Sequence, residues 1–125
     1  MKPILVVDDD AEVREMIAAV LTAASYAVRE APDGRSALDV LLAPDQSEQP
    51  CLLVVDIVMP EMSGWEFIAV IKSYYRLSLI PVIVVSGRER PSEAARQHVI
   101  ADYFTKPLDT PAFLARVEEL TSSRG

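Results

Sequence analysis

The sequence has a single cysteine, and no uncharged stretch in its 125 residues is long enough to cross a lipid bilayer. With Cys51 alone, the chain can form neither an internal disulfide nor a cysteine-based zinc site, which favours a reducing compartment. Its position before an apolar run predicts a buried core thiol. Lys2 leads almost directly into another such run, which leaves no room for a signal peptide. We therefore expect a cytoplasmic protein that does not enter a membrane.

Basic residues are scarce relative to acidic ones: 12 Lys and Arg against 19 Asp and Glu give a formal net charge of -7. Because the acids are spread along the chain, direct contact with the phosphate backbone of a nucleic acid is not expected. Hydrophobic residues make up 50% of the sequence, enough for one buried core but not for two. We expect one domain over residues 1–121, with residues 122–125 as a C-terminal tail or the start of a linker.

Five strand-like runs alternate with segments of helical periodicity, which predicts an α/β fold with a parallel sheet covered on both faces. The runs are Ile4–Val7, Tyr26–Arg29, Leu52–Val55, Val82–Val85 and Asp102–Thr105. The first, third and fourth are continuously apolar, as is typical of strands buried on both faces. The second and fifth are mixed in polarity and are expected nearer the edges of the sheet.

Capping signals and apolar spacing place the helices. The first helix follows Asp10 as its cap, the second covers about Gly34–Leu42, and the third runs from Gly64 to near Arg76. The last begins with Thr110 as its cap and Pro111 at the first helical position, where no N–H is needed. The apolar stripe of the first helix is Val13, Met16, Ile17, Val20, Leu21 and Ala24.

Polar groups end four of the five runs: the cluster Asp8–Asp10, then Asp56, Ser86 and Lys106. In an open parallel sheet, sites lie beyond the carboxyl ends of the strands, so these groups meet if the first and third strands are neighbours. The loop after the first run lacks the glycines that would cradle a dinucleotide or a nucleoside triphosphate. Hard oxygen ligands gathered there suit Mg²⁺ better than Zn²⁺.

A carboxylate beside Mg²⁺ can act as a nucleophile toward a phosphoryl group. We assign that role to Asp56, with Asp8 and Asp9 as metal ligands and the main-chain carbonyl of Val58 as a further ligand. Lys106 is then the point charge that contacts the added phosphoryl group, and Ser86 is a hydroxyl donor to it.

Four motifs occur in order along the chain: Asp8-Asp9, Asp56-Ile57-Val58-Met59-Pro60 with Ser63-Gly64, Val85-Ser86-Gly87, and Thr105-Lys106-Pro107. Over essentially its whole length the sequence therefore resembles the receiver domain of two-component response regulators. The resemblance implies a flavodoxin-like, doubly wound sheet of five parallel strands in the order 2-1-3-4-5, with five helices. It also implies a cis peptide before Pro107.

The resemblance further implies that a sensor histidine kinase or a histidine phosphotransfer protein phosphorylates Asp56 with Mg²⁺ as cofactor. Such a domain is not a classical enzyme, although it promotes its own phosphotransfer and dephosphorylation. Ser86 and Tyr103 would form the switch, in which Tyr103 turns inward as Ser86 moves toward the phosphoryl group. The fourth helix, fifth strand and fifth helix would then contact a downstream protein target, a fused effector domain or a second copy of the chain.

The sequence departs from the receiver pattern between Ser86 and Lys106. The segment is a residue or two shorter than usual, Val99 stands where glycine is common, and Gly87 stands where alanine is usual. These differences leave the chemistry of Asp56 alone but affect the fourth helix. The chain ends at Gly125, soon after the last predicted helix, which predicts a receiver without an output domain of its own.

Two other functions fit parts of the pattern. A metal-dependent phosphohydrolase working through an aspartyl phosphate needs a second acid two residues after its nucleophile, where this chain has Val58. A receiver-like scaffold would bind partners without being phosphorylated.

For several other residues, a structural role is an alternative to a functional one. His98, the only histidine, is expected on an exposed helix as a surface residue. Met62 and Trp65 either pack at the rim of the third helix or contact a partner. Tyr103 either switches or simply packs.

Overall fold

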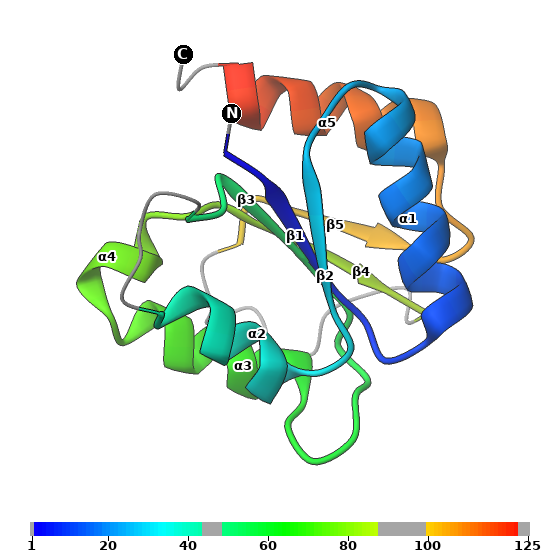
Figure 1. Ribbon diagram of the computed structural model, residues 1–125. Coiled ribbons are helices and arrows are strands. Elements are labelled where there is room, and N and C mark those ends of the chain that lie inside the picture. Colours follow the sequence, from blue (N-terminus) through cyan, green and yellow to red (C-terminus); the bar gives the residue numbers. More distant parts are fainter. Residues whose placement is uncertain (1, 44–48, 88–99, 123–125) are drawn as a thin grey trace.

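The computed structural model describes residues 2–43, 49–87 and 100–122, which form a five-stranded parallel sheet with helices on both faces (Figure 1). The strands are β1 (Ile4–Val7), β2 (Val28–Ala31), β3 (Leu52–Val55), β4 (Val82–Ser86) and β5 (Asp102–Thr105). Their spatial order is β2-β1-β3-β4-β5, and every neighbouring pair is parallel. The predicted flavodoxin-like fold class is confirmed.

The described residues contain five helices: α1 (Ala11–Ala23), α2 (Gly34–Leu41), α3 (Gly64–Lys72), α4 (Tyr75–Ser78) and α5 (Thr110–Ser122). The third helix is shorter than predicted. α3 ends at Lys72, and residues near Arg76 belong to the separate single turn α4. The fourth helix of the receiver pattern, the helix expected to carry His98 and the position of Val99 all fall on residues 88–99, outside the described residues.

Alternation along the central strands divides the core into two layers. Leu5 and Val7 face α2 and α3, whereas Ile4 and Val6 face α1 and α5. Figure 1 shows these two helix pairs on opposite faces of the sheet. Every residue of β1, β3 and β4 is buried, as their continuous apolar character predicts. Of the residues whose structure is described, the polar ones buried with this core are Asp8, Asp56 and Ser86.

The second strand lies two residues later than predicted. Tyr26 follows the turn that closes α1: its N–H donates to the Leu21 carbonyl at 3.1 Å, and Ser25 before it has a left-handed φ of 75°. Pairing with β1 therefore begins at Val28, opposite Ile4. Local β propensity at Tyr26 is overridden by the turn that closes the preceding helix.

One of the two predicted helix caps is present, and the other lies one residue earlier. Asp10 caps α1 as predicted, accepting from the N–H groups of Glu12 and Val13. Asp109, not Thr110, caps α5, since its carboxylate accepts from the Ala112 N–H at 3.2 Å. Thr110 is already helical.

Two residues that were predicted to be buried are less buried than expected. Met16 is 42% exposed, so the buried stripe of α1 is narrower than its apolar sequence suggests. Cys51 is only partly buried, and its Sγ lies 3.5 Å from the Lys2 carbonyl oxygen. It is therefore not the fully buried core thiol that its position predicts.

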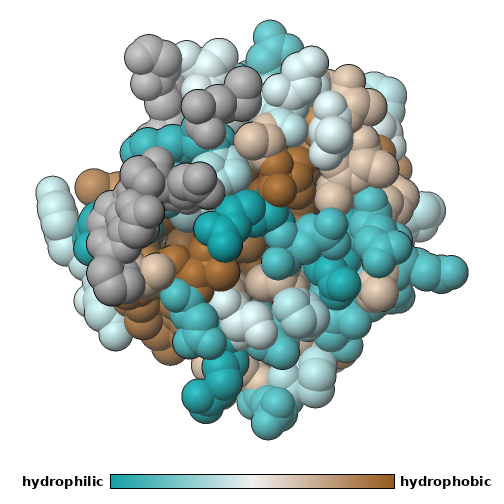
Figure 2. Space-filling model, viewed as in Figure 1, coloured by the Kyte–Doolittle hydropathy of each residue, from teal (hydrophilic) through white to brown (hydrophobic). Residues whose placement is uncertain are grey.

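Hydrophilic residues cover much of the face seen in Figure 2, with smaller hydrophobic areas between them. Within the described part of the chain, no helix combines the length and the apolar character needed to span a bilayer.

Candidate functional site

The two central strands bring the acidic segments together. β1 and β3 pair in register from Ile4 opposite Leu52 to Val7 opposite Val55, so Asp8 and Asp56 leave the sheet side by side. The Asp56 N–H donates to the Val7 carbonyl at 2.9 Å, which extends the pairing one residue past the strands. In Figure 1 the loops after β1 and β3 emerge at the same lower end of the sheet.

Carboxylate oxygens of Asp8, Asp9 and Asp56 lie within 4.8 Å of one another. Lys106, which directly follows β5, places its Nζ 3.3 Å from Asp8 Oδ2 and 3.6 Å from Asp56 Oδ1. Asp8 is 2% exposed and Asp56 6%, whereas Asp9 is exposed. The structure thus gathers the three predicted acids and the predicted lysine at one point, with one cation opposite three anions.

The electrostatics of Asp56 follow from this crowding. Burial, together with the neighbouring Asp8 carboxylate, raises the pKa of Asp56 from its ordinary value of 3.8 to about 6. Lys106 and the Ile57 N–H oppose the rise, because each stabilises the charged form. At neutral pH Asp56 is therefore ionised and remains nucleophilic, but its charge is held in an unfavourable environment.

Asp8 is fixed by its surroundings on both sides. Its Oδ1 accepts from the Asp10 N–H at 2.9 Å, and its Oδ2 faces Lys106. Its main-chain carbonyl accepts from the Arg14 guanidinium at 2.9 Å, and the same guanidinium pairs with Glu30 at 3.0 Å. Arg14 lies outside the apolar stripe that the sequence predicts for α1. Its position one turn after the cap Asp10 is the signal that could have placed it beside the loop.

Ser86 and Lys106 are positioned by the pairing of β4 with β5. Ser86 lies opposite Thr105, and its carbonyl accepts from the Lys106 N–H at 2.8 Å. Ser86 is completely buried at the end of its strand. The Lys106–Pro107 peptide is cis, as the resemblance implied.

The loop between β3 and α3 passes close beneath the end of β3. The Gly64 N–H donates to the Ile57 carbonyl at 2.8 Å, and a Cβ on Gly64 would lie 2.3 Å from the Asp56 carbonyl oxygen. Only glycine allows this approach. Val58, whose carbonyl was predicted as a metal ligand, lies in this loop and is 61% exposed.

Three residues near the site that were considered for partner contacts or for the switch pack against the hydrophobic core. Met62, Trp65 and Tyr103 are all partly buried against the core layer beneath α2 and α3. For Met62 and Trp65, packing at the rim of α3 is thus what the structure shows. Tyr103 lies on β5 opposite Val84, and its rotation remains a prediction.

The residues present fit a divalent cation with hard oxygen ligands. Two of the three carboxylates are buried, and burial of like charges is costly unless a cation compensates them. Lys106 supplies one positive charge against three negative ones. Among the described residues, no histidine or thiolate joins this group, so the donor set suits Mg²⁺ or a similar hard ion.

Comparisons with known proteins agree with this geometry. The family model of the response regulator receiver domain matches residues 4–118. An uncharacterised 14.6 kDa protein of Leptolyngbya boryana is 35% identical over 118 residues, covering 93% of this chain and 87% of that protein. Response regulator MprA of Mycolicibacterium vanbaalenii is 36% identical over 119 residues, covering 94% of this chain. This chain spans about half of MprA, 49% of its length.

Solved structures show the same arrangement of strands and helices. A putative response regulator from Chloroflexus aurantiacus superposes with a TM-score of 0.85 at 27% identity, covering 97% of this chain and 99% of the other.

Proposed function

Because this chain belongs to the family of response regulator receiver domains, we propose that it is the phosphoacceptor of a two-component phosphorelay, with Asp56 as the accepting residue. One observation carries the proposal: a buried carboxylate lies among two other acids, with the Lys106 ammonium 3.6 Å from its Oδ1. This arrangement offers a nucleophile, a place for a divalent cation and a fixed positive charge at one strand end.

In the proposed reaction, a carboxylate oxygen of Asp56 forms a bond to the phosphorus of a phosphohistidine. The P–N bond breaks, and its electron pair remains on the imidazole of the donor, a sensor histidine kinase or a histidine phosphotransfer protein. Lys106 is placed to contact an oxygen of the phosphoryl group, and the buried Ser86 hydroxyl is a second donor after a local movement. The same residues would promote hydrolysis of the resulting acyl phosphate.

Asp8, Asp9 and Asp56, together with the Val58 carbonyl, would hold Mg²⁺. Bound there, Mg²⁺ neutralises negative charge on the phosphoryl oxygens. Asp9 can adjust to the ion because it is exposed, whereas Asp8 is already fixed by the Asp10 N–H and Lys106.

Phosphorylation would then alter protein contacts. Movement of Ser86 toward the phosphoryl group would leave space for Tyr103, which is partly buried on the neighbouring strand. The surface affected would include β5, α5 and the segment between β4 and β5, where a target protein, a fused effector domain or a second copy would bind. The phosphoryl group shifts the equilibrium between the two packings only as far as it interacts more favourably with one of them than with the other.

Incubation with acetyl phosphate and Mg²⁺, followed by intact-mass measurement, tests the assignment. We expect the mass to increase by one phosphoryl group in the wild type and in Asp39→Asn, an exposed acid on α2, but not in Asp56→Asn. Light scattering with and without beryllium fluoride reports any second copy bound.

No mass increase, and no spectral response to beryllium fluoride that Asp56→Asn abolishes, would identify the chain as a scaffold that binds without phosphorylation. Sustained hydrolysis of a small phosphate ester would instead indicate a phosphohydrolase. Val58 counts against that outcome, because it occupies the position of the acid that such an enzyme needs.

A further inference from the structure

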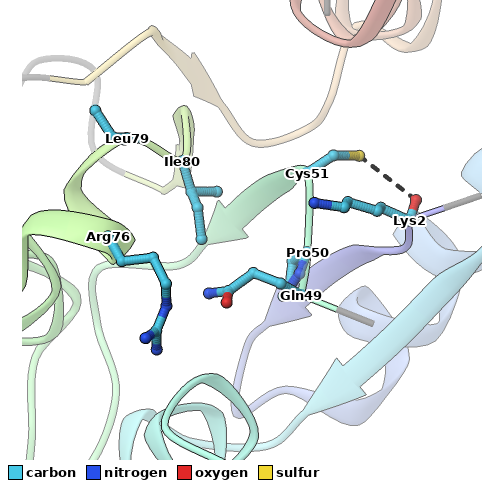
Figure 3. Close-up of a pocket in the computed structure, with 7 residues that line it drawn as sticks. All are labelled: Lys2, Gln49, Pro50, Cys51, Arg76, Leu79 and Ile80. Carbon is cyan, nitrogen blue, oxygen red and sulfur yellow. Dashed lines mark hydrogen bonds between the residues drawn. The ribbon is translucent and has the colours of Figure 1, made fainter. Parts of the chain in front are cut away.

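A pocket of about 270 Å³ lies at the end of the sheet opposite the acidic site, where β1 and β3 begin (Figure 3). It is bounded by the chain before β1, the chain before β3, and the segment around α4. Its lining residues are Lys2, Gln49, Pro50, Cys51, Arg76, Leu79 and Ile80. The volume suits a small ligand, such as one anionic group carried on a few carbon atoms.

The charges of this pocket contrast with those of the whole chain. Among the described residues that line it, Lys2, Arg76 and Cys51 are the ionisable ones, so two cations face a common space in a protein of net charge -7. Among the described residues, neither cation forms an ion pair. Two cations at a concave surface, with no ion-pair partner in the described part of the chain, attract a counter-ion.

Gln49 supplies a second, independent observation. Its side-chain Nε2 is buried and has no hydrogen-bond partner within the described part of the chain. Buried amide groups are nearly always hydrogen-bonded, so an unpaired donor here calls for an acceptor. Figure 3 shows the side chains of Gln49 and Arg76 extending toward each other, with Lys2 entering from the other side.

We propose that this pocket binds a small oxyanion, a carboxylate or a phosphate group. The planar Arg76 guanidinium can donate two parallel hydrogen bonds to such a group, Lys2 adds a second charge, and Gln49 Nε2 adds a neutral donor. Pro50, Leu79 and Ile80 give the pocket an apolar wall that would contact the carbon atoms of an organic anion. This site is separate from Asp56 and does not depend on phosphorylation.

Titration of the intact protein with inorganic phosphate and with acetate, in EDTA at constant ionic strength, tests the proposal. Calorimetry measures the affinity, and ¹H–¹⁵N spectra locate the site through the Gln49 side-chain amide and the Leu79 backbone amide. We expect saturable binding on the order of millimolar, with these signals shifting and those of Asp8 and Asp56 unmoved. The two titrants distinguish the phosphate class from the carboxylate class.

Arg76→Gln should weaken binding about tenfold or more, because it removes a charged double donor. Arg29→Gln is the matched control: Arg29 is exposed on β2 and does not line the pocket, so the same change in net charge should leave the affinity within about twofold. Equal weakening by both variants would show a general charge effect and overturn the proposal.

A further variant tests whether acidic residues of the chain compete with the added anion for the pocket. Asp45 and Glu48 precede Gln49 in the sequence, and Asp45→Asn/Glu48→Gln should bind the anion at least as tightly as the wild type. If neither protein shows saturable shifts at Gln49 and Leu79, the pocket is not an anion site.

Discussion

Asp56 is both buried and, at neutral pH, charged, a combination that costs free energy in the folded protein. The sequence identifies it, because an acid ends a continuously apolar strand. Its raised pKa could not be foreseen from the sequence, since it depends on burial and on Asp8, a residue contributed by another strand.

The pH dependence of stability follows from the raised pKa. The folded protein holds the Asp56 proton up to about pH 6, whereas the unfolded chain releases it near 3.8. This group therefore contributes stability that is fully present below pH 3.8 and is lost as the pH rises through about 6.

Replacement of Asp56 by Asn removes that dependence. In metal-free buffer, we expect the stability gain of Asp56→Asn over the wild type to be larger at pH 7 than at pH 4, by up to about 3 kcal/mol. Urea unfolding at both pH values measures it, with Asp39→Asn as control for loss of one exposed carboxylate. A stability gain that is equal at the two pH values would contradict an unfavourable buried charge on Asp56.

The two metal-binding candidates after β1 should behave differently on replacement. Asp9 is exposed and makes no side-chain hydrogen bond or ion pair with the residues that the structure describes, whereas the Asp8 carboxylate accepts from the Asp10 N–H and pairs with Lys106. Asp9→Asn should thus weaken Mg²⁺ binding about tenfold while the metal-free protein stays as stable as the wild type or becomes more stable.

Calorimetric titration with Mg²⁺ and metal-free thermal unfolding check this. Asp10→Asn is the matched control, because asparagine keeps the α1 cap and the net charge changes equally. Clear destabilisation by Asp9→Asn without metal would be evidence against repulsion among the acids.

At the scale of elements, the connection from β3 to α3 holds Asp56 in place. Ser63 and Glu66 form a capping box at the start of α3, with bonds of 3.2 and 2.9 Å. Gly64 brings that helix start against the backbone of Asp56 and Ile57. The Ser63-Gly64 pair could be recognised in the sequence, but the contact that requires glycine appears only in the fold.

Gly64→Ala tests this close approach. Its Cβ would lie 2.3 Å from the Asp56 carbonyl oxygen and 2.7 Å from Ile57 Cα, so backbone must move, and we expect a loss of about 1 to 3 kcal/mol. Gly87→Ala is the control, because a Cβ there meets nothing within 4 Å and should be close to neutral. Chemical unfolding of both variants measures the difference in stability. Equal losses would show that replacing glycine by alanine has the same effect at both positions, and that the backbone contact at Gly64 does not determine it.

Errors at the element scale have local causes. The start of β2 was placed too early because Tyr26 has β propensity, yet its N–H bonds back to the Leu21 carbonyl in the turn that closes α1. The α5 cap was assigned to Thr110 because it precedes Pro111, but Asp109 is an equally good cap one residue earlier. Such choices are decided by hydrogen bonds that residue preference alone does not rank.

At the scale of the whole molecule, the site depends on residues far apart in the chain. Lys106 and Asp8 are separated by 98 positions and meet only because β5 and β1 belong to one sheet. A ligand that bridges the strand ends binds the folded state and not the unfolded chain, so it stabilises the entire domain.

Mg²⁺ should therefore raise the melting temperature reversibly. At a concentration about ten times its Kd we expect roughly 1.4 kcal/mol of added stability, a rise of about 3 to 6 °C for a domain of this size. Differential scanning calorimetry with Mg²⁺ and then with excess EDTA measures it. Asp9→Asn should show a smaller rise at the same concentration, and a rise that persists in this variant unchanged would place the ion elsewhere.

The sequence by itself determined the alternation of strands and helices, the burial of the three central strands, and the acids, serine and lysine that end four of the runs. It could do so because periodicity and capping are local properties of the chain. Only the tertiary structure decided that the Asp8 and Asp56 side chains share one space, that Arg14 secures the loop between β1 and α1, and that Arg76 and Gln49 line a cationic pocket. These features arise from pairing between distant segments, whose energy is the sum of many contacts that no single stretch of sequence contains.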